Sequence, residues 1–230
     1  MPDENLAEEL TRFFLTIGLP ALPDDWDDRI RLIHQRVVDV NQRVNLTRIT
    51  GADEFLIKHI ADSLLLLAVR PDLPAASLKL IDVGCGAGFP GLPLAMICRP
   101  SHFVELDSNA KKVAFVDDLI TTLNLTNCRA EQGRARELAG ISHHREAYDL
   151  VLARAVGNTP KLIRECRHLL APRGGRFYIY KTPRNIAREM METQRAAARA
   201  GLQVTRSPVF TLPANAGQRQ FWILERTTDG

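Results

Sequence analysis

The segment Ile81-Asp82-Val83-Gly84-Cys85-Gly86-Ala87-Gly88-Phe89-Pro90-Gly91 decides the fold of this 230-residue chain. It joins a short apolar run to a stretch with helical spacing, so we expect a buried strand, a tight loop and a helix. Glycines at alternate positions let the loop backbone approach a ligand closely. Ligands in open α/β sheets lie beyond the carboxyl ends of the strands. The segment therefore predicts a ligand-binding loop at the edge of a parallel sheet.

Short apolar runs and helical patterns alternate after Leu78, as expected for a parallel sheet covered on both faces. The last two apolar runs have no helix between them, which predicts an antiparallel pair at the edge of the sheet. The expected strands are 79–83, 103–107, 128–132, 150–154, 176–181, 203–210 and 220–226, and the expected helices are 92–98, 109–124, 160–170 and 186–200.

The chain before this sheet is expected to be helical, because apolar residues recur at helical spacing from Leu6 to Val69. We predict an N-terminal helical cap over residues 1–76 and a ligand-binding domain over residues 77–230. The start has no basic region followed by an apolar stretch, and no apolar run approaches the roughly 20 residues of a membrane span. We therefore expect a soluble, cytoplasmic protein that does not contact membranes.

Charge and cysteine content give weak evidence about nucleic-acid binding, disulfides and metal sites. The net charge of +3 is too small to indicate nucleic-acid binding by itself, although the stretch through Asp28 is acidic and the positive charge lies later, mainly on arginine. The four cysteines are far apart and form no Cys-x-x-Cys pair, so reduced thiols are expected. We expect His143 and His144 to be solvated, and we predict no metal.

The glycine-rich loop fits two cofactor classes unequally. Residues 86–91 match the dinucleotide fingerprint G-x-G-x-x-G, so a nicotinamide or flavin oxidoreductase is one alternative. However, Asp82 stands before the first glycine, Gly84, and Asp-x-Gly-x-Gly-x-Gly resembles motif I of the S-adenosylmethionine-dependent methyltransferases. That cofactor has no pyrophosphate, and Pro90 and Pro93 remove amide donors that a phosphate would use. The register therefore favours S-adenosylmethionine.

Asp107 ends the second expected strand about 20 residues past the loop, where ribose hydroxyls are usually held. Both cofactor classes place a carboxylate here, so Asp107 supports nucleotide binding without choosing between them. Glu105 is expected on the opposite face of the strand, at the surface.

The wider pattern resembles the bacterial small-subunit ribosomal RNA guanine-N7 methyltransferases, also called glucose-inhibited division protein B. The resemblance covers about residues 40–181, and its most specific parts are Phe-Pro-Gly in the loop and Lys-His-x-x-Asp-Ser upstream. The matching motifs are Asn45-Leu46-Thr47, Lys58-His59-Ile60-Ala61-Asp62-Ser63-Leu64, residues 82–95, Leu106-Asp107-Ser108 with Lys111-Lys112, Gly133-Arg134-Ala135, Ala153-Arg154-Ala155 and Lys181.

This resemblance implies an α/β fold, a Rossmann-like class I methyltransferase sheet that is mostly parallel, with an antiparallel C-terminal edge strand and an N-terminal helical cap. It implies methyl transfer from S-adenosyl-L-methionine to N7 of a guanine in small-subunit (16S) ribosomal RNA. The cofactor would contact Gly84 and Phe89 through its methionine side, Asp107 through its ribose, Ala135 and Arg136 through its adenine, and Arg154 at the mouth of the site. Gly86 in the loop is also expected to bind it.

One position departs from the family pattern. The family usually has a carboxylate after the alanine that corresponds to Ala135, and this chain has Arg136, which cannot accept a hydrogen bond from the adenine amino group. Either the backbone holds the adenine here, or Glu137 takes over this role.

Methylation of N7 removes no proton, so the reaction needs alignment of the reactants and exclusion of water, with no general base. The target base must leave its stack and be held, and we expect Arg134, Arg154, Lys181 and His59 to position it. Lys111 and Lys112 either follow phosphates or are solvated. His59, Asp62 and Ser63 share a helical face and either cover the site or tie cap to sheet.

Arg154 ends a buried strand, where a guanidinium needs partners, which favours a functional role. Two other functions stay open at this point: a methyltransferase that acts on a small molecule or a protein, and a dinucleotide-dependent oxidoreductase. We expect the chain to act as a monomer.

Overall fold

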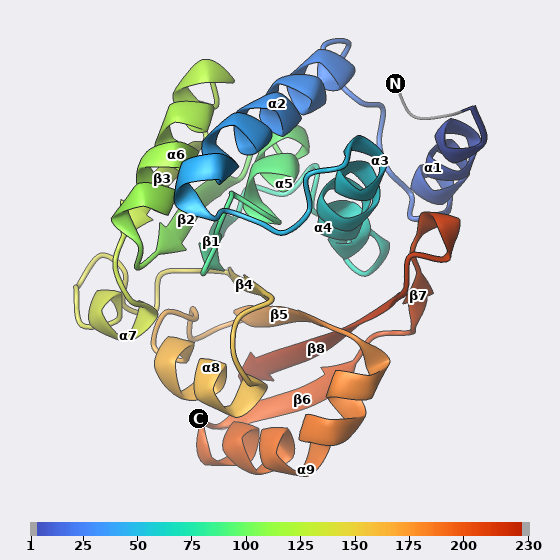
Figure 1. Cartoon of the computed structure of the whole chain (residues 1–230). Helices are drawn as coiled ribbons and strands as arrows, with labels where there is room; N and C mark the ends of the chain where they lie inside the picture. Colours follow the sequence, from blue (N-terminus) through green and yellow to red (C-terminus); the bar gives the residue numbers. More distant parts are fainter. Residues whose placement is uncertain (1–3, 227–230) are drawn as a thin grey trace.

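The computed structural model describes residues 4–226 and has an eight-stranded sheet at its centre (Figure 1). Seven strands follow the order β3-β2-β1-β4-β5-β8-β6, and β7 pairs with β8 beside them. The strands are β1 Lys79–Val83, β2 His102–Asp107, β3 Cys128–Gln132, β4 Leu150–Arg154, β5 Arg176–Lys181, β6 Leu202–Arg206, β7 Phe210–Thr211 and β8 Gln218–Arg226.

The first five strands pair in parallel, as the sequence predicts. The final antiparallel pair is also present, because β8 runs antiparallel to both β5 and β6. β8 lies between these two strands, so β6 is the edge strand at this end of the sheet and β3 is the edge strand at the other. The expected strand 203–210 is interrupted at Ser207-Pro208, since proline has no amide hydrogen for a ladder.

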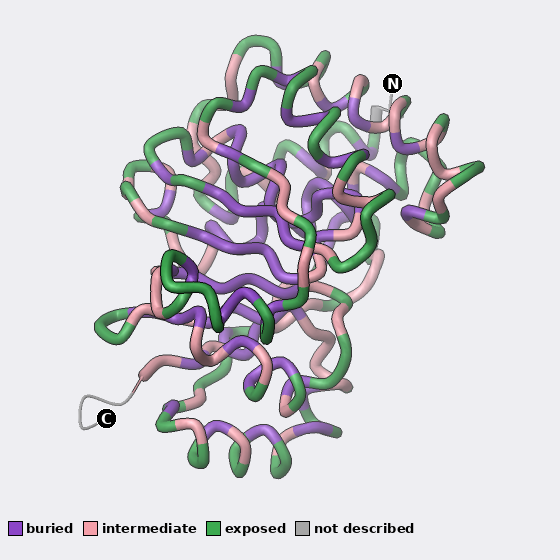
Figure 2. Tube along the Cα trace, turned by 90° about the vertical axis from the view of Figure 1, so that its left-hand side faces the viewer, coloured by how far each residue is buried: buried purple, intermediate pink, exposed green. Residues whose placement is uncertain are grey.

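Helices cover both faces of the sheet. Alternate residues of each strand point to opposite faces, so Leu80 and Phe103 pack under α2 and α6, whereas Ile81 and Val104 pack in a second cluster with α8 and α9 (Figure 1). Along the trace in Figure 2, buried positions concentrate on the strands and exposed positions on the outer turns. The helices that follow the strands are α5 Gly91–Ile97, α6 Ala110–Thr122, α7 Ala135–Leu138, α8 Thr159–Cys166 and α9 Pro183–Arg199.

The N-terminal part is helical, as expected. Its elements are α1 Glu4–Thr16, α2 Trp26–Val44, α3 Ala52–Phe55, the π-helical η1 Leu56–Ala61, α4 Asp62–Leu64 and the 3-10 helix η2 Leu65–Ala68. Ile33 and Val37 of α2 belong to the same buried cluster as Leu80 of β1. The helices therefore share their core with the sheet, and the division at residues 76 and 77 stays a prediction. Within residues 4–226, no helix is long and apolar enough to cross a membrane.

The start of α9 differs from the expected helix 186–200. Thr182 accepts a hydrogen bond from the Asn185 amide through its side chain, at 3.2 Å, and Pro183 occupies the first helical position. Threonine before proline is a strong helix-start signal, because it satisfies one of the free amides of the first turn. α9 consequently begins directly after β5.

Candidate functional site

The loop after β1 adopts a backbone that only glycine adopts freely. Gly84, Gly86 and Gly88 have φ angles of +74°, +62° and +89°. A Cβ atom at Gly84 would lie 2.6 Å from Cγ2 of Val156, whereas one at Gly86 would meet only the Gly84 carbonyl oxygen, at 4.0 Å. The side chain of Val156 therefore covers Gly84, whereas Gly86 faces open space.

The end of β2 holds this loop in place. The amides of Gly84 and Cys85 donate to the Leu106 carbonyl at 2.7 and 3.0 Å. The Gly86 amide donates to Oδ2 of Asp107 at 3.1 Å, and Oδ1 accepts from the Asn109 amide at 2.9 Å. Asp107 thus lies at the loop, beside the open space over Gly86, and each of its oxygens keeps a lone pair for a further donor.

S-adenosylmethionine fits these groups. The half-buried carboxylate of Asp107 offers acceptors to ribose hydroxyls, and Gly86 leaves room for a close approach. The Gly133 amide donates to the Asp107 carbonyl oxygen at 3.1 Å, which places the start of α7 next to the same strand end. Ala135 is buried there, and the side chains of Arg134, Arg136 and Glu137 are exposed.

Two carboxyl groups lie buried beneath the loop. Asp82 and Glu105 are register partners in β1 and β2, and they are 1% and 0% exposed. Oδ2 of Asp82 accepts from the Gly91 amide at 3.0 Å, and a Cβ atom at Gly91 would collide with the Glu105 carboxyl group. The expectation that Glu105 lies at the surface is wrong, because β2 is an inner strand covered on both faces.

Burial raises the pKa of Asp82 to about 7. Burial, together with the neighbouring Asp82 carboxylate, raises the pKa of Glu105 well above its ordinary value. Two adjacent carboxyl groups closed to water do not both ionise near neutral pH. The pair therefore keeps a proton, and this neutralises part of the charge beneath the loop.

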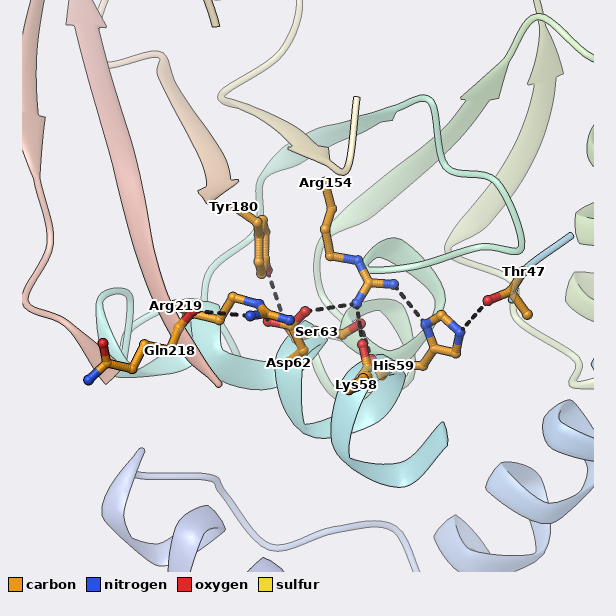
Figure 3. Close-up of polar contacts among 9 residues, drawn as sticks. All are labelled: Thr47, Lys58, His59, Asp62, Ser63, Arg154, Tyr180, Gln218 and Arg219. Carbon is orange, nitrogen blue, oxygen red and sulfur yellow. Dashed lines mark hydrogen bonds and ion pairs between the residues drawn. The ribbon is translucent and has the colours of Figure 1, made fainter. Parts of the chain in front are cut away.

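Arg154 at the end of β4 connects the sheet to the N-terminal helices (Figure 3). One guanidinium nitrogen donates to the Lys58 carbonyl at 2.8 Å and to Oδ2 of Asp62 at 3.2 Å. The other lies 3.2 Å from Nδ1 of His59. The prediction that this guanidinium needs partners is confirmed by these contacts.

Asp62 lies between two arginines. Its Oδ1 forms an ion pair of 3.0 Å with Nε of Arg219, and its side chain is only 4% exposed. Arg219 comes from β8 and, like Arg154, contacts the carboxylate of Asp62 (Figure 3). Next to it, the Tyr180 hydroxyl donates to the Ser63 carbonyl at 2.9 Å. Arg219 and Tyr180 are site residues that sequence reasoning missed.

His59 is fixed on all sides. Its ring stacks on Phe89 with centroids 4.5 Å apart and planes 9° apart, and Phe55 meets both rings edge-on. Burial, and then the charge of Arg154, lowers the pKa of His59 to about 3. Neutral His59 accepts from Arg154 at Nδ1, so its Nε2 carries the hydrogen and donates to Oγ1 of Thr47, 3.0 Å away.

These side chains surround a cavity of about 480 Å³ next to the glycine-rich loop. Val156 belongs both to its wall and to the contact over Gly84. Lys181 also lines it, and its Nζ forms an ion pair of 3.1 Å with Glu189 and donates to the Gly157 carbonyl. The structure thus brings together His59, Gly84, Phe89, Arg154 and Lys181, with Gly86, Asp107 and Ala135 on the side of α7. Arg134 and Arg136 extend from that side into solvent.

The adjacent histidines differ from expectation. His144 is fully buried, because its Nδ1 lies 2.5 Å from the Tyr148 hydroxyl and its Nε2 lies 2.8 Å from Oε1 of Glu131. The prediction that both are solvated is wrong for His144. Glu131, His143 and His144 form the one group in residues 4–226 with the composition of a metal site, and protein side chains already pair with Glu131 and His144.

Comparisons with known proteins agree with this geometry. The family model described as "GidB: rRNA small subunit methyltransferase G" matches residues 28–221. A relative from Desulfitobacterium hafniense is 34% identical over 98% of this chain and 90% of its own length, and one from Gloeobacter violaceus is 40% identical over 86% and 77%. Both are named "Ribosomal RNA small subunit methyltransferase G".

Solved structures agree on the fold alone, because their sequence identity is low. A methyltransferase from Methanosarcina mazei, described as SAM-dependent, matches with a TM-score of 0.53 at 14% identity over 69% of this chain and 96% of its own. TrmN from Thermus thermophilus matches with a TM-score of 0.52 at 18% identity over 72% and 49%. The predicted Rossmann-like methyltransferase sheet is confirmed.

The chain belongs to the rRNA small subunit methyltransferase G family, since the family model and the relatives cover most of its length. It is therefore a methyltransferase that uses S-adenosylmethionine, and the oxidoreductase alternative falls away.

Proposed function

We propose that this member of the rRNA small subunit methyltransferase G family transfers the methyl group of S-adenosylmethionine to N7 of a guanine in 16S ribosomal RNA. The names of its relatives supply the ribosomal RNA substrate. The observation that carries the proposal in this chain is a polar cavity beside the cofactor loop whose described titratable lining residues are all held by protein partners.

The basic or acidic groups that line this cavity or lie beneath the loop are engaged by protein partners or closed to solvent. His59 is neutral and uses both ring nitrogens, and the two oxygens of Asp62 face Arg154 and Arg219. Asp82 and Glu105 are closed off beneath the loop. A reaction that removes a proton from its acceptor would be poorly served here. Methylation at N7 uses a free lone pair, so it needs only the sulfonium methyl that the cofactor supplies and a correctly held base.

The residues proposed to hold the cofactor divide by their surroundings. Gly84, Gly86, Asp107 and Ala135 line the loop and the strand end next to it. Phe89 is 4% exposed and stacks on His59, so its role is to shape the loop from beneath. Arg136 is exposed and offers only donors, so we assign the adenine amino group to a backbone acceptor or to Glu137. If Glu137→Ala leaves the dissociation constant of S-adenosylmethionine unchanged, a backbone oxygen is the acceptor for the adenine amino group.

The residues proposed to position the base are Arg154, His59 and Lys181 at the cavity, with Arg134 at the adenine side. Arg154 and His59 act through the geometry that they impose, because their polar atoms are occupied by protein partners. We propose that the chain works as a monomer in the cytoplasm.

The test is transfer of labelled methyl from S-adenosylmethionine to purified small subunits, naked 16S ribosomal RNA and DNA, followed by mapping of the modified base. We expect N7-methylguanine in the RNA and no label in DNA. Absence of N7-methylguanine from every RNA would overturn the proposed substrate. Binding of S-adenosylmethionine, measured by calorimetry on the same sample, reports separately on the cofactor site.

A further inference from the structure

Charge is distributed very unevenly along this chain. Residues 159–206 contain eleven lysines and arginines against three glutamates, whereas residues 1–28 contain eight acidic residues against one arginine. The basic segment forms α8, β5, α9 and β6, and its helices α8 and α9 cover one face of the sheet. The seven acidic residues from Glu4 onward lie on α1 and around the start of α2, at the other end of the molecule (Figure 1). The two charges are thus separated in space.

The outer face of α9 carries an arginine stripe, which we define as Arg184, Arg188, Arg195 and Arg199. At about 100° per residue these four positions fall within an arc of about 60°, and they span roughly 22 Å of helix. All four are exposed, and none has an ion pair or hydrogen bond with another residue in the described part of the chain. Four unpaired guanidiniums in a row suit a polyanion with regularly spaced charges.

The inner face of α9 fixes this stripe relative to the cavity. Glu189 accepts from the Thr159 hydroxyl at 2.7 Å and pairs with Lys181 at 3.1 Å, so it joins α9 to the start of α8 and to the end of β5. Lys181, Thr182 and Asn185 line the cavity. The stripe therefore begins beside the cavity and leads away from it along a rigid helix.

We infer that the arginine stripe of α9 is a surface that binds the phosphates of the RNA whose guanine enters the cavity; this inference rests on the proposed function. Guanidiniums bind phosphate oxygens through two parallel N–H donors, and such contacts fix the register of a nucleic acid without reading its sequence. The stripe would position the RNA backbone, and the cavity would determine which base is bound.

The experiment compares wild type with R184Q/R188Q/R195Q/R199Q. Glutamine keeps the helix propensity of arginine, and the substituted side chains have no partners to lose. The control R12Q/R31Q/R36Q/R43Q makes the same charge change on α1 and α2, where it also removes the surface ion pairs of Arg31 with Asp28 and of Arg36 with Asp118. Methyl transfer to small subunits is measured against substrate concentration, and binding of naked 16S ribosomal RNA is measured at several salt concentrations.

We expect the stripe variant to raise KM for small subunits at least tenfold, with kcat and the dissociation constant of S-adenosylmethionine unchanged. Its plot of log affinity against log salt should be shallower than that of wild type by about three, since each contact to single-stranded RNA contributes about 0.7. The control should keep the wild-type KM and slope. Equal KM and slope in wild type and stripe variant would overturn the inference and leave the proposed function standing. Wild type that methylates no RNA would overturn the function itself.

Discussion

The carboxyl group of Asp82 faces that of Glu105 across strands β1 and β2, and both are closed to solvent beneath the glycine-rich loop. Asp82 also holds the amide of Gly91 at the start of α5. Two carboxyl groups that keep a proton between them therefore lie directly beneath the cofactor loop, so the stability of the fold depends on their protonation.

Stability should fall as pH rises through the neutral range. The pKa values of Asp82 and Glu105 are raised in the folded protein, and in the unfolded chain both lie near 4. Above about pH 4 these two carboxyl groups bind more protons in the folded state than in the unfolded state, so their contribution to the free energy of unfolding decreases with pH, by about 1.4 kcal/mol per pH unit for each extra proton. Glu105→Gln should flatten this dependence between pH 5 and 8 in urea titrations. The exposed Glu192→Gln is the control, and equal slopes in wild type and Glu105→Gln would contradict the shared proton.

Gly86→Ala should weaken cofactor binding more than folding. Its φ of +62° strains an alanine by about 1–2 kcal/mol, and the new methyl group would occupy the open space over the loop. We expect the dissociation constant of S-adenosylmethionine to rise at least tenfold in calorimetry. Gly18→Ala is a matched control, because Gly18 has φ +69° and open surroundings far from the loop. If both variants bind the cofactor as wild type does, the cofactor does not lie over Gly86.

Arg154→Ala should destabilise the fold more than Arg219→Ala. Arg154 holds Lys58, Asp62 and His59, whereas Arg219 pairs only with Asp62 among these residues. Loss of Arg154 leaves a buried carboxylate with one partner at its other oxygen, and breaking a buried pair costs about 3–5 kcal/mol. We expect about 1–2 kcal/mol for Arg219→Ala. Chemical denaturation of both variants and of Asp62→Asn checks the order, and a larger loss for Arg219→Ala would reverse the assignment.

His59 should make the protein sensitive to acid. Its folded pKa is about 3 and its unfolded pKa is near 6.5, so this ring binds fewer protons in the folded state, and its contribution to stability is lost as pH falls from about 6.5 towards 3. His59→Ala should remove this loss. It should also lower the free energy of unfolding at pH 8 by about 2–4 kcal/mol, since the stack on Phe89 and two hydrogen bonds disappear. Turnover at 20 °C, measured on protein shown to be folded, then reports the role of His59 in positioning.

Local signals predicted much of this structure. The register of Gly84 and Asp107 follows from a strand, a loop and the next strand, so the cofactor edge could be placed from sequence. The position of Arg219 could not be predicted in this way, because its contact with Asp62 depends on where β8 pairs in the sheet. The burial of Glu105 was missed for a related reason: the sequence predicts a sheet covered on both faces, but only the strand order shows that β2 lies between β1 and β3 and that Glu105 is the register partner of Asp82.

The position of β8 also constrains the order in which the sheet can form. β8 is synthesised after β6 but lies between β6 and β5, so β6 has no neighbouring strand until the ribosome has added β8. The same strand brings Arg219 to Asp62. A nascent chain that lacks β8 would hold a complete glycine-rich loop and an incomplete cavity. A complete cavity thus requires β8 in addition to the strands that precede it.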